Sequence, residues 1–270
     1  MSIGKRDKKN LILGVDVGNT NTVIGLIRNK SILADWRIST NPYSTSDEIA
    51  LKLKNLLELN NISLSQIKAL VLSCVVPPLL FSWEQIAQKY LSATFFNITP
   101  KSPIGIKVVY KRPFEVGSDR LVNTLAVFEL YKRSAIVVDY GTATTFDCIS
   151  SKGEYLGGVI APGILSSSNA LYEKTAKLPR VDLSVPIKNA LSQDTPSAIR
   201  AGVILGFAYL TDGMVKRLKQ EMGEETLVIA TGGLAQKVAS YSNEIEEIVP
   251  DLTLKGLALA YEKLKSILTL

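Results

Sequence analysis

The sequence contains no histidine, and this absence excludes several kinds of active site. Ser-His-Asp and Cys-His catalysis both need an imidazole as general base, and His-ligated zinc sites need it as a metal ligand. Acid-base chemistry in this chain must therefore come from Asp, Glu, Lys, Tyr or Cys side chains. The composition favours group-transfer chemistry that uses carboxylates together with a hard cation.

Cysteine is scarce, and long apolar runs are missing. Cys74 and Cys148 lie in separate strand-like segments; two cysteines cannot build a disulfide framework, so we expect both to be buried small hydrophobes. No apolar run reaches the ~20 residues of a membrane span. A charged segment precedes LILGVDV (11–17), without the apolar region of a signal peptide. We therefore expect a cytoplasmic protein with no membrane partner.

The chain is basic, with a net charge of +6 and a pI near 9.1. Outside GKRDKK (4–9), the basic residues are scattered among acidic ones. A nucleic-acid-binding face needs a basic patch and usually a recognisable motif, so we expect no nucleic-acid partner. An anionic small-molecule substrate accounts better for the excess charge. We expect residues 1–10 to form a flexible tail.

The order of elements repeats along the chain. Three strand-like segments over 11–39 precede a helix with a Thr45–Glu48 capping box, and then a strand, a helix and a strand follow. The second half starts again with three strand-like segments over 134–162, followed by helices, a strand at 226–230 and a closing helix. This repetition predicts a duplicated α/β unit, with a first domain over 1–116 and a second over 117–270.

One short pattern also occurs twice, once at the start of each half. LGVDVGNTNTVIGLI (13–27) and VVDYGTATTFDCI (137–149) both contain an apolar run, Asp-x-Gly, three residues and Thr. The pairs are Asp16, Gly18 and Thr22, and Asp139, Gly141 and Thr145. Glycine permits the tight turn, whose N–H groups and threonine hydroxyls can hold phosphate, while the Asp binds a cation or its waters. Two copies predict two turns facing each other across a cleft and holding one polyphosphate.

Six motifs, taken together, identify a family. They are DVGNTNT (16–22), EVGSDRLVN (115–123), VVDYGTATTFD (137–147), GGVIAPGI (157–164), AKLPRV (176–181) and ATGGLA (230–235). In this order and spacing they resemble the type III pantothenate kinases, a branch of the acetate kinase, sugar kinase, heat-shock protein 70 and actin superfamily. The chain departs from the family at Ser118, where alanine is usual, and in LSQDT (191–195).

The resemblance implies a fold, a reaction and partners. The fold would be two duplicated actin-like (ribonuclease H-like) βββ-α-β-α domains facing each other across a nucleotide cleft. The reaction would transfer the γ-phosphoryl group of ATP to the terminal hydroxyl of pantothenate, giving 4'-phosphopantothenate, the first committed step towards coenzyme A. Family members use Mg²⁺ with ATP and also K⁺ or NH₄⁺, and they work as homodimers.

The resemblance also implies roles for individual residues. Asp16 would hold magnesium through water, and Asp139 would bind the monovalent cation. The ATP-binding residues would be Asp16, Val17, Gly18, Asn19, Thr20, Asn21, Thr22, Val23 and Thr142. The pantothenate-binding residues would be Tyr110, Gly117, Ser118, Asp119, Arg120 and Thr195, and Asp119 would also be the general base.

Some of these residues, and other features of the sequence, have a purely structural interpretation. Ser118 and Asp119 could merely cap the helix RLVNTLAVFELY, because Ser and Asp are common N-caps. Thr195 and Pro196 are expected as N-cap and first residue of the helix over 196–222, where close helix packing would account for Gly202, Gly206 and Gly213. The acidic stretch EIEEI (244–248) is expected to form a solvated face.

Two other functions compete with the kinase. The chain could be a non-catalytic actin-like ligand sensor or a transcriptional accessory factor, but such a protein has no need to keep Asp16, Asp119 and Asp139 together. A sugar or acetate kinase is disfavoured by the EVGSDR signature and by the shortness of the chain.

Overall fold

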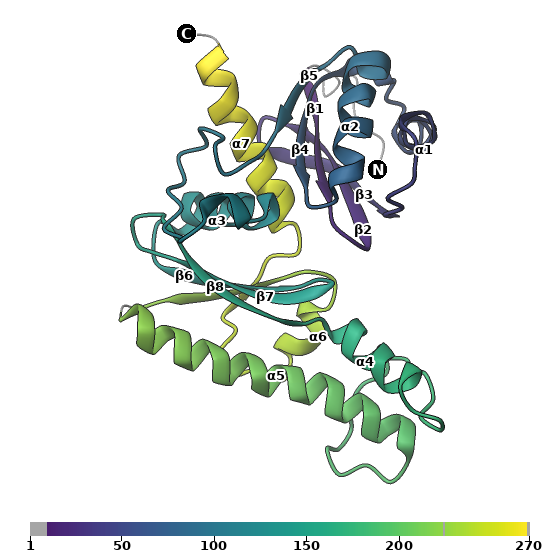
Figure 1. The fold of residues 1–270 in the computed structure, drawn as a ribbon, viewed down its shortest axis with the longest axis vertical. Helices are drawn as coiled ribbons and strands as arrows, with labels where there is room; N and C mark the ends of the chain where they lie inside the picture. Colours follow the sequence, from purple (N-terminus) through teal and green to yellow (C-terminus); the bar gives the residue numbers. More distant parts are fainter. Residues whose placement is uncertain (1–9, 224, 269–270) are drawn as a thin grey trace. The chain divides into compact units, whose positions relative to one another are not determined.

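The structure, a computed structural model, describes residues 10–223 and 225–268. The basic segment 4–9, and with it most of the expected tail, lies outside the described residues. The contacts divide the chain into two compact units, coloured along the sequence in Figure 1. The first unit comprises Met1–Leu130 and Leu252–Leu270, and the second comprises Tyr131–Asp251.

The first unit contains a five-stranded sheet in the order β3-β2-β1-β4-β5. Its strands are β1 (Leu11–Val17), β2 (Asn21–Arg28), β3 (Ser31–Ser39), β4 (Ile67–Cys74) and β5 (Thr94–Asn97). Its helices are α1 (Ser46–Glu58), α2 (Pro77–Gln85) with a π-helical continuation (Ile86–Leu91), α3 (Ser118–Tyr131) and α7 (Leu252–Leu268), with short 3-10 turns at Leu64–Gln66 and Pro113–Glu115.

The second unit contains a sheet in the order β10-β9-β6-β7-β8. Its strands are β6 (Ala135–Tyr140), β7 (Ala143–Ile149), β8 (Tyr155–Pro162), β9 (Leu227–Thr231) and the short β10 (Glu247–Ile248). Its helices are α4 (Ile164–Glu173), α5 (Thr195–Met222) and α6 (Ala235–Ala239). In each unit the first strand pairs antiparallel with the second and parallel with the fourth, so the predicted duplication is confirmed.

The compact units differ from the expected division at residues 116 and 117. Helix α7 packs on the first sheet, where the paired glycines Gly14 and Gly25 leave room for Leu257 and Leu254. Gly256 on the same helix lies against the carbonyl of Val122 in α3, where a β-carbon would collide with backbone. Both α3 and α7 therefore group with the first unit. That the duplicated halves themselves meet at 116 and 117 stays a prediction.

The core of the first unit follows the alternation of its central strand. Leu11, Leu13, Val15 and Val17 belong to the cluster that contains the buried faces of α1 and α2, whereas Ile12 packs with Ala258 of α7. The expected capping box of α1 is confirmed: Glu48 N–H donates to Thr45 Oγ1 at 3.3 Å, and Thr45 N–H donates back to Glu48 Oε2 at 2.8 Å. Helix α1 therefore begins where the sequence predicts.

Helix α5 corrects two predictions and bears on a third. Its N-cap is Asp194, whose Oδ1 accepts from Ser197 N–H at 2.8 Å, and Thr195 is already helical. A β-carbon on Gly202, Gly206 or Gly213 would meet nothing within 4 Å, so close packing does not account for these glycines. By length and composition α5 is the one helix among the described residues that could span a membrane, but half of its apolar window is buried inside the fold, so the absence of a membrane partner stays a prediction.

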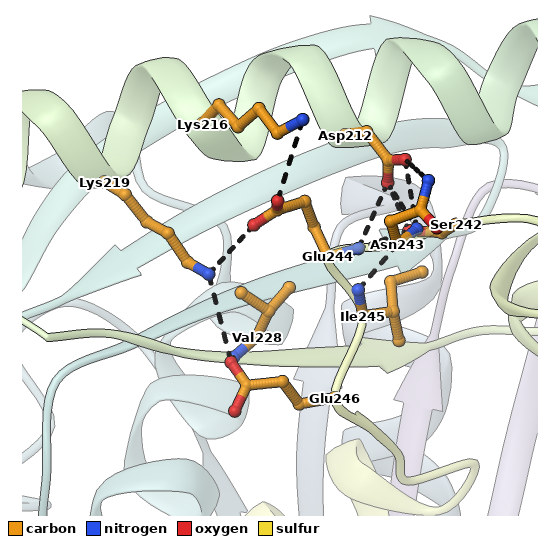
Figure 2. Close-up of polar contacts among 9 residues, drawn as sticks. All are labelled: Asp212, Lys216, Lys219, Val228, Ser242, Asn243, Glu244, Ile245 and Glu246. Atoms are coloured by element: carbon orange, nitrogen blue, oxygen red, sulfur yellow. Dashed lines mark hydrogen bonds and ion pairs between the residues drawn. The ribbon is translucent and has the colours of Figure 1, made fainter.

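The acidic stretch 244–248 is not simply a solvated face. Asp212 of α5 accepts hydrogen bonds from Ser242 Oγ at 2.5 Å, from Asn243 N–H at 3.0 and 3.1 Å to its two oxygens, and from Glu244 N–H at 3.3 Å (Figure 2). Glu244 also pairs with Lys219 of the same helix at 3.0 Å. Ile245 and Ile248 pack against the core of the second unit. The segment is therefore fastened to α5 by a buried carboxylate.

Candidate active site

The first predicted phosphate turn joins β1 to β2. Gly18 N–H donates to Asn21 C=O at 3.1 Å, and Thr40 N–H donates to Thr20 C=O at 2.9 Å, so the segment after β3 supports the turn. Thr22 is buried, and its hydroxyl lies 2.8 Å from that of Thr40. Asn19 and Thr20 are exposed at the tip. The backbone of the turn is thereby fixed, while its tip is open to a ligand.

The second turn joins β6 to β7 and is one residue shorter. Gly141 N–H donates to Ala143 C=O at 3.1 Å. Val17 pairs with Thr22 in the first unit, whereas Tyr140 pairs with Thr144 in the second. The structural counterpart of Thr22 is therefore Thr144, and the alignment with Thr145 that the sequence suggested is wrong by one position. Thr142, the residue with a predicted phosphate role, is exposed in this turn.

Two glycines from other motifs close around the second turn. A β-carbon on Gly163, which precedes α4, would collide with the carbonyl of Thr142, and Ser166 Oγ donates to that carbonyl at 3.1 Å. Gly232, with φ of +92°, lies so close that a β-carbon would be 2.6 Å from Asp139 Oδ1. The motifs GGVIAPGI and ATGGLA thus meet at the turn that carries Asp139 and Thr142.

A buried carboxylate that the sequence analysis left without a role lies in the next strand. Asp147 in β7 is fully buried, and it accepts hydrogen bonds from Tyr155 OH at 3.1 Å and from Thr145 Oγ1 at 3.2 Å. Thr145 is the cross-strand neighbour of Asp139. Asp147 therefore orients a hydroxyl beside the predicted cation ligand.

The predicted base stands in the first turn of α3. Asp119 is half-buried, and its Oδ1 accepts from Arg120 N–H at 2.9 Å. A β-carbon on Gly117 would overlap that same oxygen, so glycine is required for the carboxylate to occupy this position. Burial raises the pKa of Asp119 above its usual value, against the opposing effects of the Arg120 N–H and guanidinium. The helix already begins at Ser118, and the Asp119 carboxylate accepts from the N–H of the next residue, so this contact is not that of an N-cap.

Asp119 and Asp16 come from elements that meet inside the first unit. Ser118 Oγ accepts from Cys74 N–H at 2.9 Å, so the start of α3 is fastened to the end of β4. Ser118 Oγ lies 3.1 Å from Ser73 Oγ, and Ser73 Oγ donates to Asp16 Oδ1 at 2.9 Å. Ser118, the residue at which the chain departs from the family, thus joins the two predicted sites. Ser73 was missed by sequence analysis, because a serine inside an apolar strand gives no signal.

Thr195 occupies a different part of the second unit, and Tyr110 a different part of the first. Thr195 is exposed at the start of α5, beside a groove between α4 and α5 of about 790 Å³. Leu171, Ile199 and Phe207 line it together with Gly202 and Gly206. Tyr110 is exposed on the irregular segment before α3. The substrate-binding roles of Thr195 and Tyr110 stay predictions.

The carboxylate of Asp16 fits a magnesium ion whose other ligands are water and nucleotide phosphates. Among the described residues no three His, Cys, Asp or Glu side chains gather into one site, so the protein does not form an all-protein cage there. Mg²⁺ at kinase sites is usually held by one or two carboxylates, water and substrate phosphates. Asp16 is a half-buried carboxylate beside the first turn, oriented by Ser73. This arrangement suits magnesium held through water.

Comparisons with known proteins agree with the motifs. The family model described as type III pantothenate kinase matches residues 12–217. The "Type III pantothenate kinase" of Syntrophus aciditrophicus (strain SB) is 48% identical over 253 residues, which cover 94% of this chain and 99% of that protein.

Solved structures show the fold. An activator of 2-hydroxyisocaproyl-CoA dehydratase from Clostridium difficile has a TM-score of 0.54 at 16% identity, with coverage of 96% of this chain and 98% of that one. A ROK family glucokinase from Streptomyces griseus has a TM-score of 0.53 at 12% identity, with coverage of 92% and 98%. These neighbours, with the two duplicated sheets, confirm the predicted two-domain actin-like fold. From the family model and this close relative, the chain belongs to the type III pantothenate kinase family.

Proposed function

We propose that this chain phosphorylates pantothenate with ATP, in the reaction that gives its family its name. The observation that carries the proposal is the link from Asp16 through Ser73 and Ser118 to the start of the helix that bears Asp119. A phosphate turn and a carboxylate base held by one hydrogen-bonded framework suit phosphoryl transfer, which depends on alignment more than on covalent help.

Asp119 acts as the general base. The terminal hydroxyl oxygen of pantothenate attacks the γ-phosphorus while the bond to the β,γ-bridging oxygen breaks, and ADP leaves. The hydroxyl proton passes to the Asp119 carboxylate. Because burial raises the pKa of this carboxyl, its carboxylate is a better proton acceptor than that of an exposed aspartate. Arg120, next in the chain, offers a guanidinium fork to a polar or carboxylate group of the substrate.

The two turns hold the nucleotide. In the first, residues 16–23 form the phosphate turn, with Asn19 and Thr20 at its exposed tip, and in the second Thr142 contributes its hydroxyl. Asp16 holds Mg²⁺ through water, and the ion supplies neutralisation of the charge that develops on the phosphates. Asp139 binds K⁺ or NH₄⁺, for which a carboxylate is a suitable hard ligand. The turn at Thr231–Leu234, which lies against Asp139, forms a third nucleotide element.

Pantothenate contacts Tyr110, Gly117, Ser118, Arg120 and Thr195 in this proposal. Thr195 would contribute from the second unit, at the rim of the α4–α5 groove. The enzyme works in the cytoplasm, without nucleic-acid or membrane partners.

The same groove supports a homodimer. Leu165, Leu171 and Tyr172 on α4 and Tyr209 on α5 are large apolar or aromatic side chains that are exposed in the isolated chain. An open apolar groove bordered by such residues suits a second copy of the chain. Light scattering should give twice the 29.4 kDa of the chain, and a fully active monomer would refute the dimer.

A panel of acceptors tests the function. The purified protein is incubated with ATP, Mg²⁺ and KCl, and with pantothenate, glucose, acetate or no acceptor, and ADP is measured by a coupled assay. We expect ADP formation that depends on pantothenate alone. Equal rates without pantothenate, or a preference for glucose or acetate, would overturn the proposal.

A further inference from the structure

The hydrogen bonds between Asp16 and the start of α3 have a fixed direction. Ser73 donates its only proton to Asp16 Oδ1, so its oxygen must accept in the contact with Ser118. Ser118 Oγ already accepts from Cys74 N–H, and its own proton therefore goes to Ser73. The order of donation is Cys74 N–H to Ser118, Ser118 to Ser73, and Ser73 to Asp16. This relay ends on a carboxylate that accepts at Oδ1.

Burial makes the relay rigid. Ser73 is completely buried and Ser118 is 6% exposed, so water cannot easily replace either hydroxyl. A buried polar group that loses its hydrogen-bond partner is costly, which holds both hydroxyls in these orientations. Val75, two residues beyond Ser73, lies near Gly117: a β-carbon added to that glycine would lie 3.6 Å from Val75 Cγ1. The end of β4 is therefore packed against the segment that leads into Asp119.

The second unit has a hydroxyl at the equivalent place. Ser73 is the parallel-strand neighbour of Asp16, and Thr231 is the parallel-strand neighbour of Asp139. Thr231 is also buried, at 2% exposure. A hydroxyl residue beside the turn aspartate is thus repeated in both halves, whereas the extension to the start of a helix through Ser118 belongs to the first.

We propose that Ser73 and Ser118 are positioning residues. They orient the Asp16 carboxylate towards its magnesium ion and hold this carboxylate in a fixed position relative to Asp119. The proposal rests on the proposed roles of Asp16 and Asp119. Loss of a group that orients a metal-binding carboxylate typically lowers metal affinity or activity by about 10–100-fold. Because Ser118 acts on Asp16 only through Ser73, its own loss should have a smaller effect.

The test measures nucleotide binding and rate in four variants. Binding of ADP is measured by calorimetry with and without Mg²⁺, and the rate is measured against free Mg²⁺ at saturating substrates. We expect Ser73→Ala to weaken MgADP roughly 10-fold and to raise the half-activating Mg²⁺ concentration similarly, with ADP alone unaffected. Ser118→Ala should give roughly a 3-fold effect, and the double variant should be no worse than Ser73→Ala. Ser73→Thr, which keeps the hydroxyl, should restore binding.

Ser134→Ala is the matched control. Ser134 is also a buried serine, 1% exposed, bonded to the Ile149 carbonyl and to the Thr226 hydroxyl, but it precedes β6 at the end of the strand opposite to Asp139. Its loss should lower the melting temperature without changing the dependence on Mg²⁺. Variants of Ser73 and Ser118 that melt earlier but bind MgADP as the wild type does, or whose effects add in the double variant, would overturn the relay. A wild type that binds ADP equally with and without Mg²⁺ would instead refute the role of Asp16, and the proposal with it.

Discussion

Replacement of Gly117 by alanine should separate catalysis from folding. A β-carbon at this position would overlap Asp119 Oδ1, while its next neighbour, Val75 Cγ1, would be at an ordinary 3.6 Å. The colliding atom is the end of a side chain rather than backbone, so the carboxylate can move aside. The glycine does not have a positive φ, and alanine causes no backbone strain there.

The size of the effect follows from that overlap. To restore a normal carbon–oxygen contact the Asp119 oxygen must move by about 1 Å, and a misplacement of this size at a catalytic group can cost about 10²-fold in rate. Since the carboxylate also loses its place beside Arg120 N–H, we expect a stability loss of about 1 kcal/mol. The variant should therefore be folded, slow, and near normal in its affinity for ADP.

The assay compares kcat at saturating ATP and pantothenate with the melting temperature of each variant. Gly213→Ala is the control, because a β-carbon there meets nothing within 4 Å and the residue lies outside the proposed site. In the interior of α5 this change should raise stability by about 0.8–1 kcal/mol and leave kcat unaltered. If Gly117→Ala keeps a kcat within twofold of the wild type, Asp119 does not act from the position described.

Three further predictions concern single groups. Asp119→Asn should lower kcat by roughly 10²–10⁴-fold with little change in nucleotide affinity, and wild-type turnover in this variant would show that Asp119 is not the base. In the wild type, the acid limb of the pH profile of kcat/KM should lie above the ordinary aspartate pKa of 3.8, because burial raises the pKa of Asp119. Titration with KCl, NH₄Cl or NaCl at constant ionic strength should show strong activation by K⁺ and NH₄⁺ and much less by Na⁺. Equal rates with all three cations would show that Asp139 does not bind the monovalent cation. Asp212→Asn should destabilise the fold at pH 7 by roughly 2 kcal/mol, because it disrupts charge-assisted hydrogen bonds to residues 242–244. The folded-state pKa of Asp212 is lowered below 3.8, so its stabilisation is present above pH 3.8 and lost as the pH falls from there through the folded pKa; urea unfolding against pH should show this loss in the wild type only.

The duplication could be predicted from the sequence because it depends on local patterns. Buried strands, Asp-x-Gly turns and the Thr45 capping box are properties of neighbouring residues, and they occur where expected. The length of each turn could not be predicted, since it depends on the register between strands. Val17 pairs with Thr22, but Tyr140 pairs with Thr144. Alignment of the two Asp-x-Gly-x₃-Thr patterns therefore misplaced the threonines of the two turns by one residue.

Contacts between segments that are distant in the chain could not be predicted from the sequence. The glycines of α5 look like packing positions, yet their side of the helix faces open space, which no periodicity reveals. In EIEEI the charges suggested a solvated face, but Asp212, more than thirty residues earlier, fixes its start. The place of α7 on the first sheet depends on Gly14 and Gly25, which lie more than two hundred residues before it.

The most direct test of the central claim identifies the phosphorylated product. The protein is incubated with ATP, Mg²⁺, KCl and pantothenate, ADP is quantified, and the acceptor is analysed by phosphorus NMR and mass spectrometry. We predict one phosphopantothenate for each ADP, with the phosphate on the terminal hydroxyl oxygen, and no product from Asp119→Asn on the same timescale. ADP without phosphopantothenate, or phosphate transferred to water, would contradict the account.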